Sequence, residues 1–275
     1  MAELLFGTGG TPISSGGPST IDGIERIAEL GLGCMEMEFV RGVHMSKETA
    51  LQVAEAAGRL KVKLTAHAPY FINLNSAEID KVKASQYRII QTARIASLCG
   101  AESIAVHAAF YGGESPEKVY RTVKQYLAEV LDELAEEGNL VWIRPEVMGK
   151  GTQFGTVEEL VNLSAELPQV LPVIDFAHWH ARTGENNTYD EFAAVLEQIK
   201  QKLGRKPLEN MHMHISGIKY GLKGELKHLN LQESDLNYPD LMKALKDYKV
   251  GGFAICESPN LEEDALLMKR TYETL

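Results

Sequence analysis

The stretch LPVIDFAHWH, residues 171–180, starts like a buried strand and ends in acidic and imidazole side chains. Its apolar first half is typical of a strand covered on both faces in a parallel sheet. Asp175, His178 and His180 follow where the apolar run stops. We expect Asp175 and His178 to face one rim from a loop after the strand, whereas His180 either binds a metal ion or makes a hydrogen bond. The segment therefore predicts a βα unit with a functional site at its strand end.

The same strand-then-helix pattern repeats eight times along the chain, without a linker or low-complexity tract to mark a boundary. Eight such units are what a closed (β/α)8 barrel requires, whereas an open doubly wound sheet more often has five or six strands. We therefore predict an α/β fold, a single TIM-barrel domain over residues 1–275. The expected strands are 4–8, 34–39, 63–67, 103–107, 140–146, 172–175, 211–216 and 253–257.

Composition narrows the class of protein. The formal net charge of −10 argues mildly against broad attraction to nucleic acid, although bound divalent cations would reverse the local field. No apolar run approaches the roughly 18 residues of a membrane span, and the N-terminus lacks the features of a signal peptide. We therefore expect a cytoplasmic protein with no membrane partner, and a monomer. Cys34, Cys99 and Cys256 show no paired spacing and are expected to be reduced and buried.

Six of the expected strands end in potential metal ligands, and the carboxyl ends of barrel strands share one face. Taken singly, such a histidine can be a satisfied core or loop residue, and such a glutamate can pair with an arginine. Together, three carboxylates and at least four imidazoles on one rim are costly to desolvate unless cations neutralise the acids. The residues are His67, His107, Glu146, Asp175, His178, His214 and Glu257.

The MHMHISG segment places His212 and His214 two residues apart on one face of a strand. His214 lies nearer the rim and is the better ligand, so His212 is expected deeper in the barrel, where it fills a layer or orients a ligand. Oxygen and imidazole ligands without thiolate suit zinc or manganese, and carboxylates that can bridge favour more than one ion. Closely spaced divalent ions in turn suit phosphoester hydrolysis.

Several motifs, in order, resemble those of the endonuclease IV family of apurinic/apyrimidinic (AP) endonucleases. HAPYFINL resembles the family's HxSYxINL segment, VIDFAHWH its DTCH segment and HISGIK its HLNDSK segment. A histidine ending the fourth strand, a glutamate with a Gly-rich continuation ending the fifth, and ICESP complete the order over about residues 65–258. The chain most resembles an archaeal and bacterial endonuclease-IV-like branch, with HISG and KHLNL, of the xylose isomerase-like TIM barrels.

This resemblance implies a zinc-dependent, deoxyribonuclease IV-like hydrolase of DNA repair. Such an enzyme cleaves the phosphodiester on the 5′ side of abasic sites in duplex DNA, and Glu257 would orient the attacking hydroxide, with Glu146 as the second catalytic carboxylate. Three ion sites are implied: His67, His107 and Glu146 at the first; Glu146, Asp175, His214 and Glu257 at the second; and His178 with His228 at the third.

One position departs from the family pattern. The family has an aspartate two residues before the last histidine ligand, and this chain has Leu226 there. Either Glu225 substitutes for it, or the protein works with two ions.

Contacts to DNA are also implied by the resemblance. Tyr70 stands where the family uses an aromatic or apolar side chain to invade the DNA stack, although it could instead pack on a neighbouring loop. The candidate phosphate contacts could equally be solvated surface charges. They are Arg41, Lys150, Lys219, Lys223 and Lys227.

A different class of enzyme would use some of the same candidate ligand residues. Sugar isomerases and epimerases with xylose isomerase-like barrels bind one divalent ion through Glu, Asp, His and Glu, a quartet that residues 146, 175, 214 and 257 also supply. Two glutamates would then move a proton next to a carbonyl. The surplus histidines favour the hydrolase, because a single ion does not need them. A non-catalytic barrel that binds metal and damaged nucleic acid is a third reading, and the substrate could be DNA, RNA or a smaller phosphoester.

Overall fold

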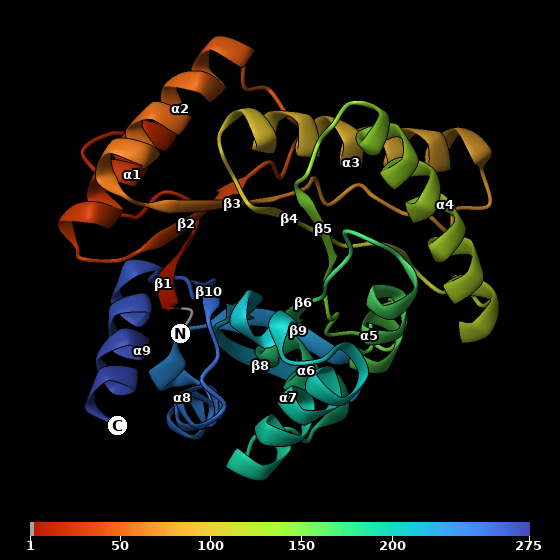
Figure 1. Ribbon diagram of the computed structural model, residues 1–275. Helices are drawn as coiled ribbons and strands as arrows, with labels where there is room; N and C mark the ends of the chain where they lie inside the picture. The colour runs from red at the N-terminus through yellow and green to blue at the C-terminus, as the bar shows by residue number, and fades with distance from the viewer. Residues whose placement is uncertain (1–2) are drawn as a thin grey trace.

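A computed structural model describes residues 3–275 as a barrel of eight parallel strands with helices around the outside (Figure 1). The strands run in the order β5-β4-β3-β2-β1-β10-β7-β6, all parallel within this sheet. Two isolated parallel bridges, Ile143 with Val170 and Glu146 with Val173, close the gap between the first and last strands. The predicted (β/α)8 barrel is therefore confirmed.

Each barrel strand begins and ends within two residues of its predicted range. The apolar runs that identified them are buried, because every barrel strand packs inward on the barrel interior and outward on a helix layer. The strands are β1 (Leu4–Gly9), β2 (Cys34–Glu38), β3 (Lys63–His67), β4 (Ser103–Val106), β5 (Trp142–Pro145), β6 (Val173–Asp175), β7 (Met211–Ile215) and β10 (Gly252–Cys256).

The outer helices begin at capping residues that the sequence places before apolar stripes. Ser19, Ser46, Ser115 and Thr156 each accept a hydrogen bond from a backbone amide of the first turn. The helices are α1 (Thr20–Glu29), α2 (Lys47–Leu60), α3 (Ile79–Leu98), α4 (Pro116–Glu136), α5 (Val157–Glu166), α6 (Phe176–Thr183), α7 (Tyr189–Leu203), α8 (Tyr238–Asp247) and α9 (Glu262–Thr274), with short 3-10 turns η1 (Lys206–Glu209) and η2 (Leu231–Glu233).

Two elements at the carboxyl-terminal face differ from the expected loops. The segment after β6 is the helix α6, because Asp175 caps it by accepting a hydrogen bond from the His178 amide at 2.7 Å. The expectation of a loop there was wrong. After β7 the chain forms an antiparallel hairpin of β8 (Gly217–Gly221) and β9 (Gly224–Leu229), which packs on α6. Its sequence alternates apolar side chains at Ile218, Tyr220 and Leu222, but this run is short and interrupted by Gly221 and Gly224, so it gives only a weak strand signal.

The remaining sequence expectations that the fold tests concern cysteines and membrane spans. All three cysteines are buried and unpaired, as predicted. Within residues 3–275, no helix is long and apolar enough to cross a membrane.

Candidate metal centre

The structure brings the predicted rim residues together at the carboxyl-terminal mouth of the barrel. His67 ends β3, Asp175 ends β6 and His214 lies in β7, while three others follow β4, β5 and β10 directly. Most of them line a cavity of about 300 Å³, together with Tyr70, Lys150 and Glu225. The sequence located this convergence correctly because parallel barrel strands present their carboxyl ends on one face.

Five groups of potential ligand atoms in the described residues have their atoms within 4.8 Å of one another, and three of these groups overlap through the predicted rim residues. Glu146 belongs to two groups and Asp175 to two, so both carboxylates occupy bridging positions. The three overlapping groups are His67, His107 and Glu146; Glu146, Asp175, His214 and Glu257; and Asp175, His178 and His228.

The distances within these groups fit shared cations. His107 Nε2 and His67 Nε2 lie 3.0 and 3.2 Å from Glu146 Oε2, and His214 Nδ1 lies 3.4 Å from Glu146 Oε1. Ligand atoms about 2.0–2.2 Å from one tetrahedral ion stand roughly 3.3–3.6 Å apart, so the observed spacings match or lie slightly inside that range. His214 Nδ1 and Asp175 Oδ2 are also buried without a hydrogen-bond partner among the described residues. An ion at this position would satisfy both atoms.

Electrostatics at the mouth follow from burial and from the close packing of opposite charges. Burial favours the neutral form of Glu146, but His107 and His214 hold its pKa well below the ordinary value. Burial also opposes charge on His67, yet its contact with Glu146 and the charge of Glu38 raise its pKa to about 10. Burial raises the pKa of Asp175 to about 6. Protonated imidazoles thus balance the acids here, and a bound cation would displace those protons.

Glu225, rather than Leu226, faces the third group of ligands. Lys219 pairs with Lys227, and Tyr220 pairs with Glu225, so Leu226 is the extra residue of a β-bulge in β9. The bulge shifts the alternation by one position and leaves Leu226 62% exposed. Glu225 Oε2 lies 3.6 Å from His178 Nε2. The position that the family pattern assigns to a ligand is therefore turned outward, and the carboxylate of its neighbour Glu225 lies beside His178 instead.

The β5–α5 loop fixes the hairpin in this position. The Glu225 amide donates a hydrogen bond to the Gly149 carbonyl at 3.0 Å. A Cβ atom on Gly149 would lie 2.7 Å from the Glu225 Cβ, so this approach requires glycine. The Gly-rich continuation after Glu146 thus holds Glu225 over the mouth.

Two further histidines have partners that explain them. His180 Nδ1 lies 2.8 Å from the Glu185 carbonyl and its Nε2 lies 3.4 Å from Asp235 Oδ1, so it has the hydrogen-bonding role and lies outside the ligand groups. His212 is fully buried one layer below His214, where it contacts Glu36 and Ser103.

Of the candidate DNA contacts, two line the cavity at the mouth and the others do not. Tyr70 lines the cavity, is 46% exposed and stacks on the His107 ring at a centroid distance of 5.1 Å. Lys150 also lines the cavity. Arg41 and Lys219 are exposed but lie outside the cavity lining, and Lys219 borders a separate surface depression on the hairpin.

Two acidic residues at the site were missed by the sequence interpretation. Glu36 and Glu38 alternate along β2 and both point into the barrel, and Glu38 forms a close group with Glu36 and Glu257. Burial raises the pKa of Glu38 to about 8. The segment MEME could have revealed these two residues, because two charged residues at alternate positions of a buried strand share one face of the sheet.

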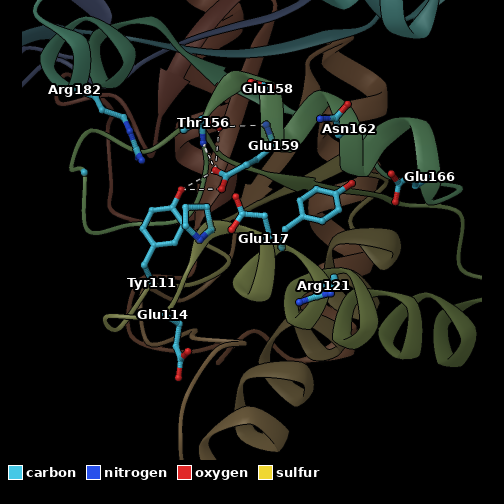
Figure 2. Close-up of a pocket in the computed structure, with 13 residues that line it drawn as sticks. Tyr111, Glu114, Glu117, Arg121, Thr156, Glu158, Glu159, Asn162, Glu166 and Arg182 are labelled. Atoms are coloured by element: carbon cyan, nitrogen blue, oxygen red, sulfur yellow. Dashed lines mark hydrogen bonds between the residues drawn. The ribbon is translucent and has the colours of Figure 1, made fainter.

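A larger cavity of about 880 Å³ lies outside the barrel, between α4 and α5 (Figure 2). Five glutamates line it, which disfavours an anionic ligand. Its central Glu159 already accepts hydrogen bonds from Tyr111 and Thr156. Arg182 donates to three backbone carbonyls of the β5–α5 loop. Glu159 and Arg182 are thus engaged in hydrogen bonds that hold neighbouring elements together. The mouth of the barrel therefore remains the candidate site.

Comparisons with known proteins agree with the fold. Residues 24–273 match the family described as xylose isomerase-like TIM barrel. "Uncharacterized protein MJ0133" of Methanocaldococcus jannaschii is 42% identical over 273 residues, which is 99% of this chain and 98% of that protein. "Probable endonuclease 4" of Mycoplasma pneumoniae is 28% identical over 191 residues, which is 66% of this chain and 63% of that protein.

Solved structures resemble the barrel over nearly its whole length. Endonuclease IV from Thermus thermophilus has a TM-score of 0.70 at 19% identity and covers 97% of this chain and 98% of its own. A D-tagatose 3-epimerase-like protein has a TM-score of 0.71 at 20% identity, with 92% and 91% covered. At these identities the likeness shows the fold alone, and that fold is common to nucleases and epimerases. Together with the family match, it shows that the chain belongs to the xylose isomerase-like TIM barrel family.

Proposed function

We propose that this protein is a metal-dependent phosphodiester hydrolase that cleaves DNA 5′ to abasic sites. The observation that carries the proposal is the overlap of three ligand groups through Glu146 and Asp175. Shared carboxylates hold ions close together, and closely spaced ions suit phosphoester hydrolysis. A barrel that binds one ion has no use for the outer histidines, which are buried or half-buried at the mouth.

Nitrogen and oxygen ligands without thiolate favour zinc, with manganese as the alternative. When bound, the ions would polarise the phosphate and supply a nucleophile at neutral pH. The proposed ligands are His67, His107 and Glu146 for the first ion; Glu146, Asp175, His214 and Glu257 for the second; and Asp175, His178, His228 and Glu225 for the third.

Glu257 is proposed as the catalytic base that orients the attacking water. Its Oε1 lies 3.4 Å from His214 Nδ1, and its side chain borders the open cavity. Glu146 is only 1% exposed and contacts four histidines, which suits a bridging role that tunes the charge at the reacting centre. Both carboxylates touch the space where a phosphate would bind.

The rim supports a nucleic-acid substrate. Tyr70, Phe71 and Phe110 are 46%, 69% and 44% exposed, and aromatic rings at such a rim can stack on bases or fill the gap at an abasic site. On the hairpin, Lys219 and Lys227 are direct cross-strand partners. Like charges placed opposite each other are destabilising unless an anion lies over them. A phosphate backbone that extends beyond the mouth would supply that anion.

The direct test is cleavage of a labelled duplex with one abasic site by protein that carries at least two ions. We expect incision on the 5′ side, which chelation abolishes and added zinc or manganese restores. An intact duplex of the same sequence is the matched control. Parallel assays with abasic single strands, RNA and a small phosphodiester would identify another phosphoester as the preferred substrate. Failure to cleave any phosphodiester with two or more ions bound would overturn the proposal.

A sugar epimerase is the second candidate. The group formed by Glu146, Asp175, His214 and Glu257 could hold a single ion between two glutamates positioned to move a proton. The net charge of −10 also suits a small neutral sugar better than DNA. Incubation with ketoses in D2O would show deuterium incorporation next to the carbonyl if this reading is correct. Such an enzyme would keep its activity with one ion per chain.

A further inference from the structure

A second polar cluster lies inside the barrel, one layer below the ligands of the mouth. Its four side chains have no exposed surface and come from β2, β3, β4 and β7. Interior layers of such barrels are dominated by bulky apolar side chains, so a closed polar layer requires a reason. The members are Glu36, Thr65, Ser103 and His212.

Glu36 lies at the centre of this cluster and also reaches a ligand of the mouth. Its Oε2 accepts a hydrogen bond from Thr65 Oγ1 at 2.8 Å and lies 2.8 Å from His212 Nε2. Its Oε1 lies 2.8 Å from His214 Nε2. One carboxylate therefore spans two histidines at successive levels of β7.

Glu36, His212 and His214 also form a close group of potential ligand atoms, but their contacts are shorter than those at the mouth. The contacts of Glu36 with both rings are 2.8 Å, which is the separation of a charge-assisted hydrogen bond. The contacts of Glu146 at the mouth with His67, His107, His178 and His214 are 3.0–3.4 Å, which is closer to the roughly 3.3–3.6 Å between two ligands of one tetrahedral ion.

The positions of the protons follow from the acceptors. A carboxylate surrounded by three donors is ionised and can only accept. Glu36 Oε1 lies 2.8 Å from His214 Nε2, so this nitrogen can direct its proton toward Glu36. When a cation replaces the second ring proton, Nδ1 becomes the lone-pair nitrogen, and it faces Glu146 and Glu257 at 3.4 Å each. A lone pair between two carboxylates is unfavourable without a cation.

We infer that Glu36 is a positioning residue that fixes the tautomer and angle of His214, so that Nδ1 is presented to the second ion. His212 and Thr65 hold the Glu36 carboxylate in turn, and Ser103 Oγ lies 3.1 Å from His212 Nδ1 and fixes that ring. Carboxylates behind histidine ligands typically change metal affinity by 10–100-fold. This inference rests on the proposed metal centre and adds the group that orients one of its ligands.

The test is Glu36→Gln, with zinc affinity and the number of ions per chain measured by competition with a chelating dye. A glutamine can offer an amide N–H to His214 Nε2, which moves the ring proton to Nδ1 and blocks coordination. We expect the ion at His214 to bind 10–100-fold more weakly, while the ion at His67 and His107 keeps its affinity. Thr65→Val is the matched control, because it removes another partner of Glu36 and leaves His214 with its acceptor.

A second measurement separates positioning from folding. In zinc-loaded protein with 15N-labelled histidine, His214 should show a protonated Nε2 and a coordinated Nδ1, and Glu36→Asp should weaken that pattern without removing the charge. Equal affinity of every ion in Glu36→Gln, or a uniform loss at all sites, would overturn the inference. If Glu36→Gln does not fold, a His214 that is unprotonated at Nε2 in the parent protein would overturn it. A parent protein that binds two or more ions but cleaves no phosphodiester would refute only the proposed function.

Discussion

The Nε2 atoms of His178 and His228 face each other at 3.3 Å, although the two residues are 50 positions apart in the chain. His178 Nδ1 lies 3.1 Å from the Val147 carbonyl, and His228 Nδ1 lies 3.2 Å from the Glu257 carbonyl. A carbonyl only accepts, so each Nδ1 can donate a proton to its carbonyl, and each Nε2 can offer its lone pair toward the other when a cation lies between them. Two facing lone pairs suit a shared cation, which makes this pair the best-defined part of the third site.

Glu225→Ala should weaken binding of the third ion, whereas Leu226→Ala should not. Glu225 Oε2 lies 3.6 Å from His178 Nε2, and the bulge turns Leu226 toward solvent. We expect zinc affinity at this site to fall by about tenfold or more, the range for removal of a group that supports a metal site. Equilibrium dialysis of both variants measures this. A loss in Leu226→Ala equal to that in Glu225→Ala would contradict the assignment.

His107→Gln should reduce the number of bound ions by about one per chain. His107 Nε2 and His67 Nε2 both contact Glu146 Oε2, so loss of one imidazole leaves the first ion with two protein ligands. Elemental analysis after gel filtration gives the ratio of ions to chain. His180→Gln is the control, because His180 is buried but bonded to Glu185 and Asp235 outside the ligand groups. Unchanged ion content in His107→Gln would refute the first site.

Glu257→Gln should lower the rate of hydrolysis by roughly 10²–10⁴-fold, the range for loss of a general base. The amide keeps the shape of the side chain and can still offer one oxygen to an ion. The rate should be measured on the abasic duplex together with metal content, at saturating zinc. Unchanged hydrolysis with the ions retained would remove Glu257 from the catalytic role.

The metal-free protein should become less stable as pH rises from about 6.5 to about 10. Despite burial, contacts with carboxylates raise the pKa of both His67 and His178 to about 10, above the ordinary value of 6.5. A histidine with a raised folded pKa stabilises the fold fully below its unfolded pKa and loses that contribution as pH passes the folded one. Thermal unfolding in chelator across this range tests the expectation.

Added zinc provides the control for that pH series. Metal ions replace the ring protons, so the melting temperature of zinc-loaded protein should depend less on pH between about 6.5 and 10. A melting temperature that stays constant in chelator would show that the protonated imidazoles do not stabilise the metal-free mouth.

The eight barrel strands and the place of the candidate ligands could be predicted from the sequence. Short apolar runs alternating with amphipathic segments indicate βα units, and His67, Asp175 and His214 stand at the ends of such runs. Because every parallel barrel strand ends on the same face, position along the chain was enough to predict that these side chains converge.

The helix after β6 and the hairpin after β7 could not be predicted in the same way. Asp175 was correctly chosen as a rim residue, but its second role as a helix cap depends on its hydrogen bond to the His178 amide. The apolar alternation in the hairpin sequence is short, and its strands are held by pairing with each other and by the Gly149 carbonyl. The contact with Gly149 joins segments that are far apart in the chain, which local pattern does not report.

The sequence by itself determined the barrel, the face that holds the site and most of the candidate ligands, because these depend on local periodicity and strand direction. Only the tertiary structure decided that Glu225 rather than Leu226 faces His178, and that Glu36 stands behind His214. A β-bulge changes side-chain phase through cross-strand pairing, and a contact across the barrel joins β2 to β7. Both depend on how separate segments meet in space.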